Sequence, residues 1–311
     1  MAVGVRDEGQ ETMNPRAQIR MLPDGRRLHL NDGPIDLIVE AFGEQCEVDA
    51  AYRAGCARFV TVLDELCSEL SFLRQACCPD TAWPSGVVAR RMTAAVLPYA
   101  SECFITPMAA VAGAVAEEIL ATMVNAANLS RAYVNDGGDI ALHLTANERF
   151  TVGMIERPDR PSLFGTTMLQ FADPVRGIAT SGWRGRSFSL GIADAVTVLA
   201  DRAAAADAAA TIIANAVDLP GHRAIRRIPA CDLAPDTDLG HRLATQFVGD
   251  LTISEVAQAL ANGAQMADRL LRMGLIRSAA LHLQGETQIV GDIRTAQLMS
   301  IPADERILLH A

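Results

Sequence analysis

The chain has 311 residues, half of them hydrophobic, enough for one large globular domain or two closely packed ones. Its net charge of −10 argues against nucleic acid as a partner, because a negative surface repels phosphate backbones. The seven cysteines have neither paired spacing nor neighbouring histidines, which excludes zinc-ribbon and disulfide frameworks and favours reduced thiols in a cytoplasmic protein. No apolar run approaches the roughly 18 residues that a membrane span needs.

The first part of the chain predicts a small sheet followed by helices. Residues 1–14 are polar, lack the apolar core of a secretory signal and are expected to be disordered. Strands are predicted at 17–22, 26–30 and 35–42, the first two joined by an Asp-Gly turn. Apolar spacing predicts helices at 44–75, 87–97 and 106–128, the last with Pro107 in its first turn.

The remainder predicts further hairpins around two more helices. Strands are expected at 131–135, 139–144, 150–155, 166–172 and 187–199, with a short segment at 177–182 that ends in Thr180-Ser181-Gly182, before an Ala-rich helix at 201–217. A loop at 222–240, a helix from Ser254 to about Met273 and a hairpin of 276–283 with 287–290 follow. Hairpins interrupted by helices predict an α+β fold of antiparallel sheets and long Ala-rich helices. We expect one α+β domain over 15–221, with a helix and hairpin from 222–311 packed on it.

Asp207 and Thr211 give the strongest local signal for chemistry. They are four residues apart and share one face of a helix whose other residues there are mostly alanine. A carboxylate and a hydroxyl are hard oxygen ligands, and such a pair could hold Mg²⁺ together with water or substrate phosphate. The alternative is an Asp and a Thr on an ordinary amphipathic helix, and spacing alone favours that alternative.

Three glycine-containing segments could accompany this pair. The turn Asn135-Asp136-Gly137-Gly138-Asp139 allows close approach of a ligand to the backbone, or is a plain hairpin turn. The second segment could cradle a phosphate or carboxylate, or be an exposed basic loop; its polar positions and glycine are Thr180, Ser181, Gly182, Arg184 and Arg186. The third, 108–113, opens a helix with small residues that suit a nearby anion or helix packing.

The order of these segments resembles that of the ApbE flavin transferases. A Gly-Gly-Asp turn is followed by Ala-Thr-Ser-Gly at 179–182, a Val-Thr-Val strand at 196–198 and Ala-Asp-Ala-x-Ala-Thr at 206–211. The motifs at 108–113 and 191–194 make the chain most similar to the branch called uncharacterised protein family 0280. The resemblance implies a T-fold-like α+β architecture, dependence on Mg²⁺ and binding of FAD. It also implies transfer of FMN to a Thr or Ser of an acceptor protein, or hydrolysis of FAD as by a pyrophosphatase.

The resemblance assigns roles to residues by position. Asp207 and Thr211 match the metal-binding Asp and Thr of the family, and the backbone carbonyl near Ala110 matches a further metal ligand. Gly137, Gly138 and Asp139 match the flavin-side loop. A second pocket loop is matched by Thr180, Ser181 and Gly182. Asn135, Arg184 and Arg186 complete the expected cofactor-binding set.

The chain departs from the transferases at two places. Ala112-Gly113 stands where they carry Lys-Gly, and no histidine lies between Gly182 and Asp194, where they carry His-Ile-x-Asp-Pro. That histidine is the family's expected proton-transfer residue, and such help is typically worth about 10²–10⁴-fold in rate. Three hypotheses therefore stay open: a flavin transferase or FAD pyrophosphatase, another metal-assisted enzyme acting on a small anionic metabolite, and a non-catalytic ligand-binding or assembly partner. Ala-rich faces are also compatible with a homodimer.

Overall fold

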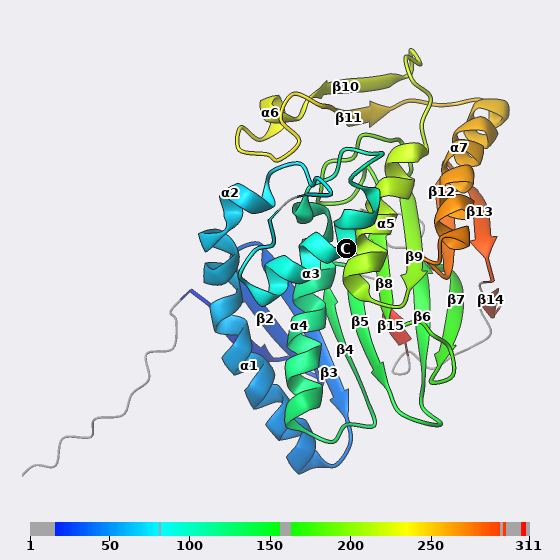
Figure 1. Cartoon of the computed structure of the whole chain (residues 1–311). Helices are drawn as coiled ribbons and strands as arrows, with labels where there is room; N and C mark the ends of the chain where they lie inside the picture. The colour runs from blue at the N-terminus through cyan, green and yellow to red at the C-terminus, as the bar shows by residue number, and fades with distance from the viewer. Residues whose placement is uncertain (1–15, 81, 156–162, 293–294, 297–305, 309–311) are drawn as a thin grey trace, which may run out of the picture.

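A nine-stranded antiparallel sheet forms the centre of the molecule (Figure 1). The structure is a computed structural model that describes residues 16–80, 82–155, 163–292, 295–296 and 306–308. The strands, in spatial order, are β1 (Gln18–Met21), β2 (Leu28–Asp32), β3 (Ile35–Phe42), β4 (Arg131–Asp136), β5 (Asp139–Leu144), β8 (Gly177–Ser181), β9 (Ala195–Ala200), β12 (Ser278–Leu283) and β13 (Glu286–Gly291).

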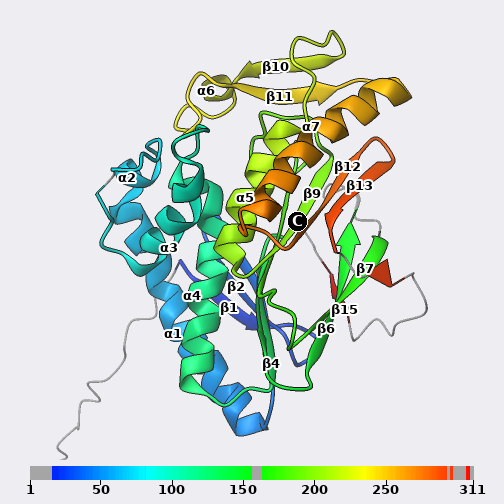
Figure 2. The ribbon, with the colours of Figure 1, turned by 45° about the vertical axis from the view of Figure 1, so that its right-hand side comes forward.

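Helices cover one face of this sheet (Figures 1 and 2). The longer ones are α1 (Gln45–Ser68), α3 (Val87–Val96), α4 (Val111–Ala126), α5 (Ala203–Ala216) and α7 (Ile253–Arg272). Short turns of helix are α2 (Leu70–Leu73), η1 (Leu97–Tyr99) and η2 (Pro107–Ala110). Strand alternation makes this possible, since Leu37 and Val39 of β3 join the core beneath the helices while Ile38 packs on the other side.

A smaller sheet covers the opposite face. Its order is β14 (Thr295–Ala296), β7 (Leu163–Gln170), β6 (Arg149–Ile155) and β15 (Arg306–Leu308). Phe150 and Val152 of β6 pack against Ile140 and Ile178 of the large sheet in a second buried cluster. The result is three layers, helices on a large sheet on a small sheet, and the predicted α+β fold with antiparallel sheets is confirmed.

Three predictions along the chain were wrong. The strand expected over 187–199 is a strand only from Ala195, because Asn215 Oδ1 accepts the Leu190 N–H at 2.9 Å and holds the earlier residues against α5 as a loop. The loop expected over 222–240 contains β10 (Ile225–Pro229) and α6 (Ala230–Leu233), and β10 pairs with β11 (Leu243–Val248) across the top of Figure 1. Helix α7 is capped by Thr252 rather than opened by Ser254. The expected disorder of residues 1–14 lies outside the described residues.

The segment Pro107–Ala126 is apolar and long enough to cross a membrane by length and composition, which the sequence did not predict. Just over half of it is buried inside the fold. It packs among the helices, with contacts to α1, α3 and α5, and against β4 and β5. Its apolar character is therefore explained by its place in the core. None of the seven cysteines, all of which lie in the described residues, forms a disulfide bond.

Candidate functional site

Asp207 lies where α4 and α5 cross closely. A Cβ on Gly113 would stand 2.4 Å from the Ala203 carbonyl oxygen, so only glycine permits this approach of the two helices. The Gly113 N–H donates to Asp207 Oδ2 at 3.1 Å. Thr211 follows one turn later on α5 and is partly buried, while Ala110 is buried at the end of η2, directly before α4. The crossing thus brings Gly113, at the end of the 108–113 segment, to Asp207 of the predicted pair.

The 135–139 turn connects β4 to β5 and presents two carboxyl groups. Asp136 and Asp139 are paired across the ladder, and both Gly137 and Gly138 have positive φ, at 61° and 113°. Asn135 Oδ1 accepts the Gly138 N–H at 2.8 Å, so this side chain holds the turn itself. The geometry of the turn therefore explains the two glycines and Asn135. Asp136 and Asp139 are the ionisable residues of the turn, and the turn itself does not require them.

Strand β8 places the next predicted segment beside Asp139. The Thr180 N–H donates to Asp139 Oδ1 at 3.2 Å, and the Thr180 hydroxyl lies 3.0 Å from that of Thr197 on β9. A Cβ on Gly182 would stand 2.5 Å from the Asp194 carbonyl oxygen, so the chain after partly buried Ser181 also needs glycine. These contacts fix the start of the loop 182–186 next to the carboxyl groups of the turn.

Three carboxyl groups form one electrostatic group, here called the acid cluster: Asp136, Asp139 and Asp207. Burial, with the charge of Asp139 adding to it, raises the pKa of Asp136 to about 8. Burial and the charge of Asp207 raise the pKa of Asp139 well above its usual value. Burial also raises the pKa of Asp207 to about 7, and the charge of Asp136 adds to this while the Gly113 N–H opposes it. Segments far apart in sequence therefore meet at one site.

The two arginines of the loop 182–186 have different surroundings. Arg186 lies against the turn, because a Cβ on Gly137 would stand 2.0 Å from its Nη2, and its charge lowers the pKa of Asp136 and Asp139. Arg184 Nε instead donates to Asp194 Oδ1 at 2.6 Å, and its guanidinium stacks on the Trp183 ring. Arg186 is thus the loop arginine whose charge acts on the acid cluster.

Asp194 organises this loop, a role that sequence reasoning missed. It is 3% exposed, and Oδ1 accepts from both Trp183 Nε1 and Arg184 Nε, at 3.2 and 2.6 Å. Its Oδ2 accepts the Gln284 N–H at 2.7 Å. Asp136 was quoted in the turn motif without a role. The position of Asp136 beside the two glycines of the turn, opposite Asp139, is the sequence feature that could have indicated its role.

The oxygen donors predicted to bind Mg²⁺ fit this ion only if a phosphate ligand and water complete its coordination. Across the described residues, no three His, Cys, Asp or Glu side chains are arranged as ligands of a metal ion. The predicted set is of another kind, with the Asp207 carboxylate, the Thr211 hydroxyl and the Ala110 carbonyl. Mg²⁺ commonly keeps several waters and uses only one or two carboxylates with substrate phosphates. The raised pKa values of Asp136 and Asp207 mean that their ionised forms are disfavoured here, and a bound cation would favour those forms. The residues therefore fit Mg²⁺ that is bound together with a phosphate ligand and water.

Two groups of known proteins are similar to this chain. A UPF0280 protein of Methanopyrus kandleri is 40% identical over 129 residues, covering 41% of this chain and 48% of the relative. One from Methanococcoides burtonii is 40% identical over 123 residues, covering 39% and 49%. The chain spans about half the length of the curated relatives it matches.

Among solved structures, two flavin transferases align at low identity. The apo flavinyl transferase ApbE of Pseudomonas stutzeri is 9% identical with a TM-score of 0.44, covering 90% of this chain and 95% of that one. The flavin transferase ApbE of Vibrio cholerae is 12% identical with a TM-score of 0.37, covering 90% and 98%. A family model described as AbpE bacteria matches residues 19–289, and the chain belongs to this ApbE-like family.

Proposed function

We propose that this chain is a Mg²⁺-dependent ApbE-like enzyme that binds FAD beside the acid cluster and cleaves its pyrophosphate. The proposal is carried by one observation, the meeting of four distant segments at Asp207 and Asp139. Gly113 bonds Asp207, Thr180 bonds Asp139, and the two carboxyl groups act on each other electrostatically. Family membership supports the same reading.

The acid cluster sets a requirement for any phosphate ligand. Carboxylates repel phosphates, so a pyrophosphate needs a cation between itself and Asp207. When bound, Mg²⁺ would offset the charge of the pyrophosphate and of the leaving AMP. Asp207, Thr211 and the Ala110 carbonyl are the groups that would hold it. Arg186, whose guanidinium lies against Gly137, would donate to a phosphate oxygen.

The proposed step is an exchange at the phosphorus of the FMN half. The bond from this phosphorus to the bridging oxygen breaks, and AMP leaves with that oxygen and the bonding electrons. A new bond forms from the phosphorus to the oxygen of an acceptor Thr or Ser hydroxyl, or of water. The proton of that hydroxyl passes to a carboxylate, and we assign this role to Asp139, which Thr180 holds in place. Asp139 thereby substitutes for the histidine that the 182–194 segment lacks.

The test is product analysis. Purified protein is incubated with FAD and Mg²⁺ or EDTA, and FMN and AMP are measured by chromatography, along with flavin bound covalently to added acceptor candidates. We expect Mg²⁺-dependent AMP release, reduced about 100-fold or more in Asp207→Asn. Asp268→Asn, on the exposed side of α7, is the matched control and should keep full activity. Equal activity in Asp207→Asn, or no AMP from the wild type in any condition, would contradict the proposal.

A second candidate is a metal-assisted enzyme acting on a small anionic metabolite. The position of exposed Arg186 against the turn favours it, because one guanidinium suits a single carboxylate or phosphate. Mg²⁺-dependent turnover of such a metabolite that requires both Arg186 and Asp207, without cleavage of FAD, would identify this function instead.

A further inference from the structure

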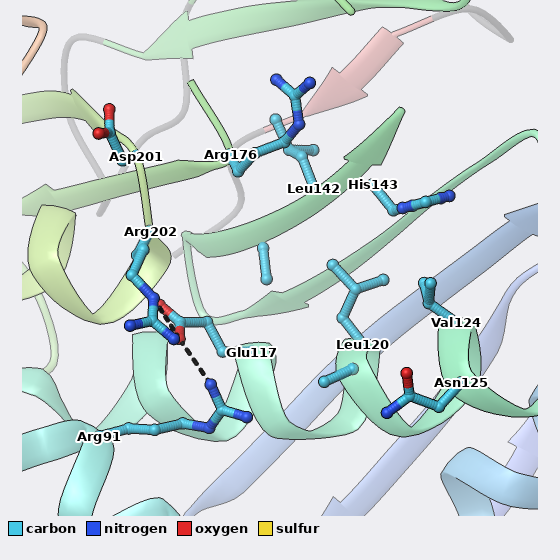
Figure 3. A pocket seen from close by; sticks show the side chains of 12 residues that line it. Arg91, Glu117, Leu120, Val124, Asn125, Leu142, His143, Arg176, Asp201 and Arg202 are labelled. Carbon is cyan, nitrogen blue, oxygen red and sulfur yellow. Dashed lines mark hydrogen bonds and ion pairs between the residues drawn. The ribbon is translucent and has the colours of Figure 1, made fainter. Parts of the chain in front are cut away.

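A cavity of about 320 Å³ opens between α4, β5 and the residues just before α5 (Figure 3). It is lined by α4 from Glu117 onward, by β5 from Ala141 to His143 and by the residues just before α5. No residue of the acid cluster lines it. Its volume is at the lower end of the range for small-molecule sites, about 300–1,000 Å³. It is thus a second, separate place where a ligand could bind.

The carboxylates that line the cavity are already bound to positive groups or donors. Glu117 Oε1 accepts the Ala204 N–H at 2.9 Å, and its Oε2 lies 3.2 Å from Arg91 Nη1. Figure 3 shows Arg91 and Arg202 converging on this one carboxylate. Asp201 is bonded by both Nε and Nη2 of Arg277, at 2.5 and 2.6 Å. Neither carboxylate therefore leaves an unopposed negative charge in the cavity.

Arg176 adds a positive charge from the sheet side. Its guanidinium donates to the carbonyl oxygens of Phe171, Asp173 and Val175, at 2.6 to 2.8 Å. Across the described ranges of the chain, no carboxylate forms an ion pair with it. Burial is the main cause of the lowered pKa of His143, and the positive charge of Arg176 lowers this pKa further. The field of Arg176 therefore reaches the cavity wall at His143. A positive charge without a carboxylate beside a cavity attracts anions.

Arg202 can supply direct contacts from the opposite side. Its side chain is 63% exposed, and in the described part of the chain its ion-pair contact is with Glu117 at 3.5 Å. This is longer than the roughly 2.7–2.9 Å of a charge-assisted hydrogen bond, so the guanidinium donors can turn to a ligand. The α4 side chains Leu120 and Val124 form the apolar part of the lining.

We propose that this cavity binds a small organic anion, with its carboxylate or phosphate held by Arg202 and favoured by the nearby charge of Arg176, and with a compact apolar group against Leu120 and Val124. The protein as a whole is negative, at −10. Binding should therefore come from these local groups and weaken as salt rises. The site does not depend on the proposed action on FAD, since it uses other residues.

Calorimetric titration tests the proposal with two probes of the shared chemistry, phenyl phosphate and benzoate, and with inorganic phosphate for comparison. We expect saturable binding of at least one organic probe, tighter than inorganic phosphate, and weakened tenfold or more in Arg202→Gln. Arg272→Gln is the matched control, because its side chain is similarly exposed at 69% and lies on α7. Stronger binding of phenyl phosphate would assign the site to phosphate esters, and stronger binding of benzoate to carboxylates.

Further variants separate this site from the acid cluster. Arg176→Gln should also weaken binding, while Asp207→Asn should leave it unchanged. No saturable binding at millimolar probe, equal loss in Arg272→Gln, or retention in both Arg202→Gln and Arg176→Gln would overturn the proposal. Loss in Asp207→Asn would place the anion at the acid cluster instead and would equally overturn it. Failure here leaves the FAD assay untouched.

Discussion

The Gly113 N–H on α4 donates a hydrogen bond of 3.1 Å to the Asp207 carboxylate on α5, and the two residues are 94 positions apart in the sequence. The bond exists because Gly113 lets α4 approach the first turn of α5 at Ala203. It fixes the direction of the Asp207 side chain from a rigid element rather than from a loop. Placement of the proposed metal ligand therefore depends on a residue that carries no functional group.

Gly113→Ala should destabilise the fold and misplace Asp207. The new Cβ would meet the Ala203 carbonyl oxygen at 2.4 Å, and backbone cannot move aside as a flexible side chain can. We expect a loss of about 1–3 kcal/mol in the free energy of unfolding, measured by urea denaturation. Gly249→Ala is the control, since its Cβ would make ordinary contacts of 3.4 Å and beyond. Equal stability of the two variants would show that the close helix approach is not required.

The acid cluster should make stability depend on pH. The folded-state pKa values of about 7 for Asp207 and about 8 for Asp136 lie above the usual aspartate value of 3.8, so folding favours the protonated forms. The stabilisation of the fold that comes from these protonated carboxyl groups is fully present below pH 4 and is lost as the pH rises toward 8. We expect the metal-free protein to become steadily less stable from pH 5 to about pH 8, by about 1.4 kcal/mol per pH unit for each group that keeps its proton in the folded state. Urea denaturation at several pH values measures it.

Two comparisons isolate the cluster in that experiment. Asp136→Asn should flatten the dependence on pH, whereas Asp268→Asn, at an exposed pair on α7, should leave it as in the wild type. Mg²⁺ should stabilise the protein more at pH 8.5 than at pH 5, because it binds the ionised carboxylates. A wild-type profile that rises steadily to pH 8.5 without metal would be inconsistent with the raised pKa values.

Asp194→Ala should release the loop 182–186. The substitution leaves the donors of Trp183, Arg184 and Gln284 without their acceptor. We expect a loss of about 3 kcal/mol in unfolding free energy and a red-shifted Trp183 emission, read in a Trp83→Phe background. Asp236→Ala, at an exposed ion pair with Arg74, should cost less than about 1 kcal/mol. Similar costs for both would mean that Asp194 does not hold the loop.

The sequence predicted the elements whose pattern is local. Apolar spacing located α1, start signals and alanine-rich runs located α4, α5 and α7, and Asp-Gly and Gly-Gly turns located the hairpins. It failed where tertiary contacts decide the backbone. The β-branched character of the 187–199 segment predicted a strand, yet Asn215 holds its first part as a loop through Leu190. Within the part of the chain that the structure describes, strands β10 and β11 pair only with each other, and neither stands out by alternation.

The candidate site was predictable only in part, for a related reason. Asp207 and Asp139 could be singled out by neighbouring alanines or glycines. That the two carboxyl groups act on each other, and that Asp136 joins them, depends on strands and a helix that meet in space. The hydrogen bond from Arg184 to Asp194 could not be predicted either, since the two residues are ten positions apart in a loop.

The most direct test of the account is calorimetric titration of FAD into the protein with Mg²⁺ and with EDTA. Wild type, Asp207→Asn and the control Asp268→Asn are compared under identical conditions. The account predicts binding that requires Mg²⁺, is kept in the control and is weakened at least tenfold in Asp207→Asn. FAD binding of equal strength in EDTA or in Asp207→Asn, or no binding at all, would contradict it.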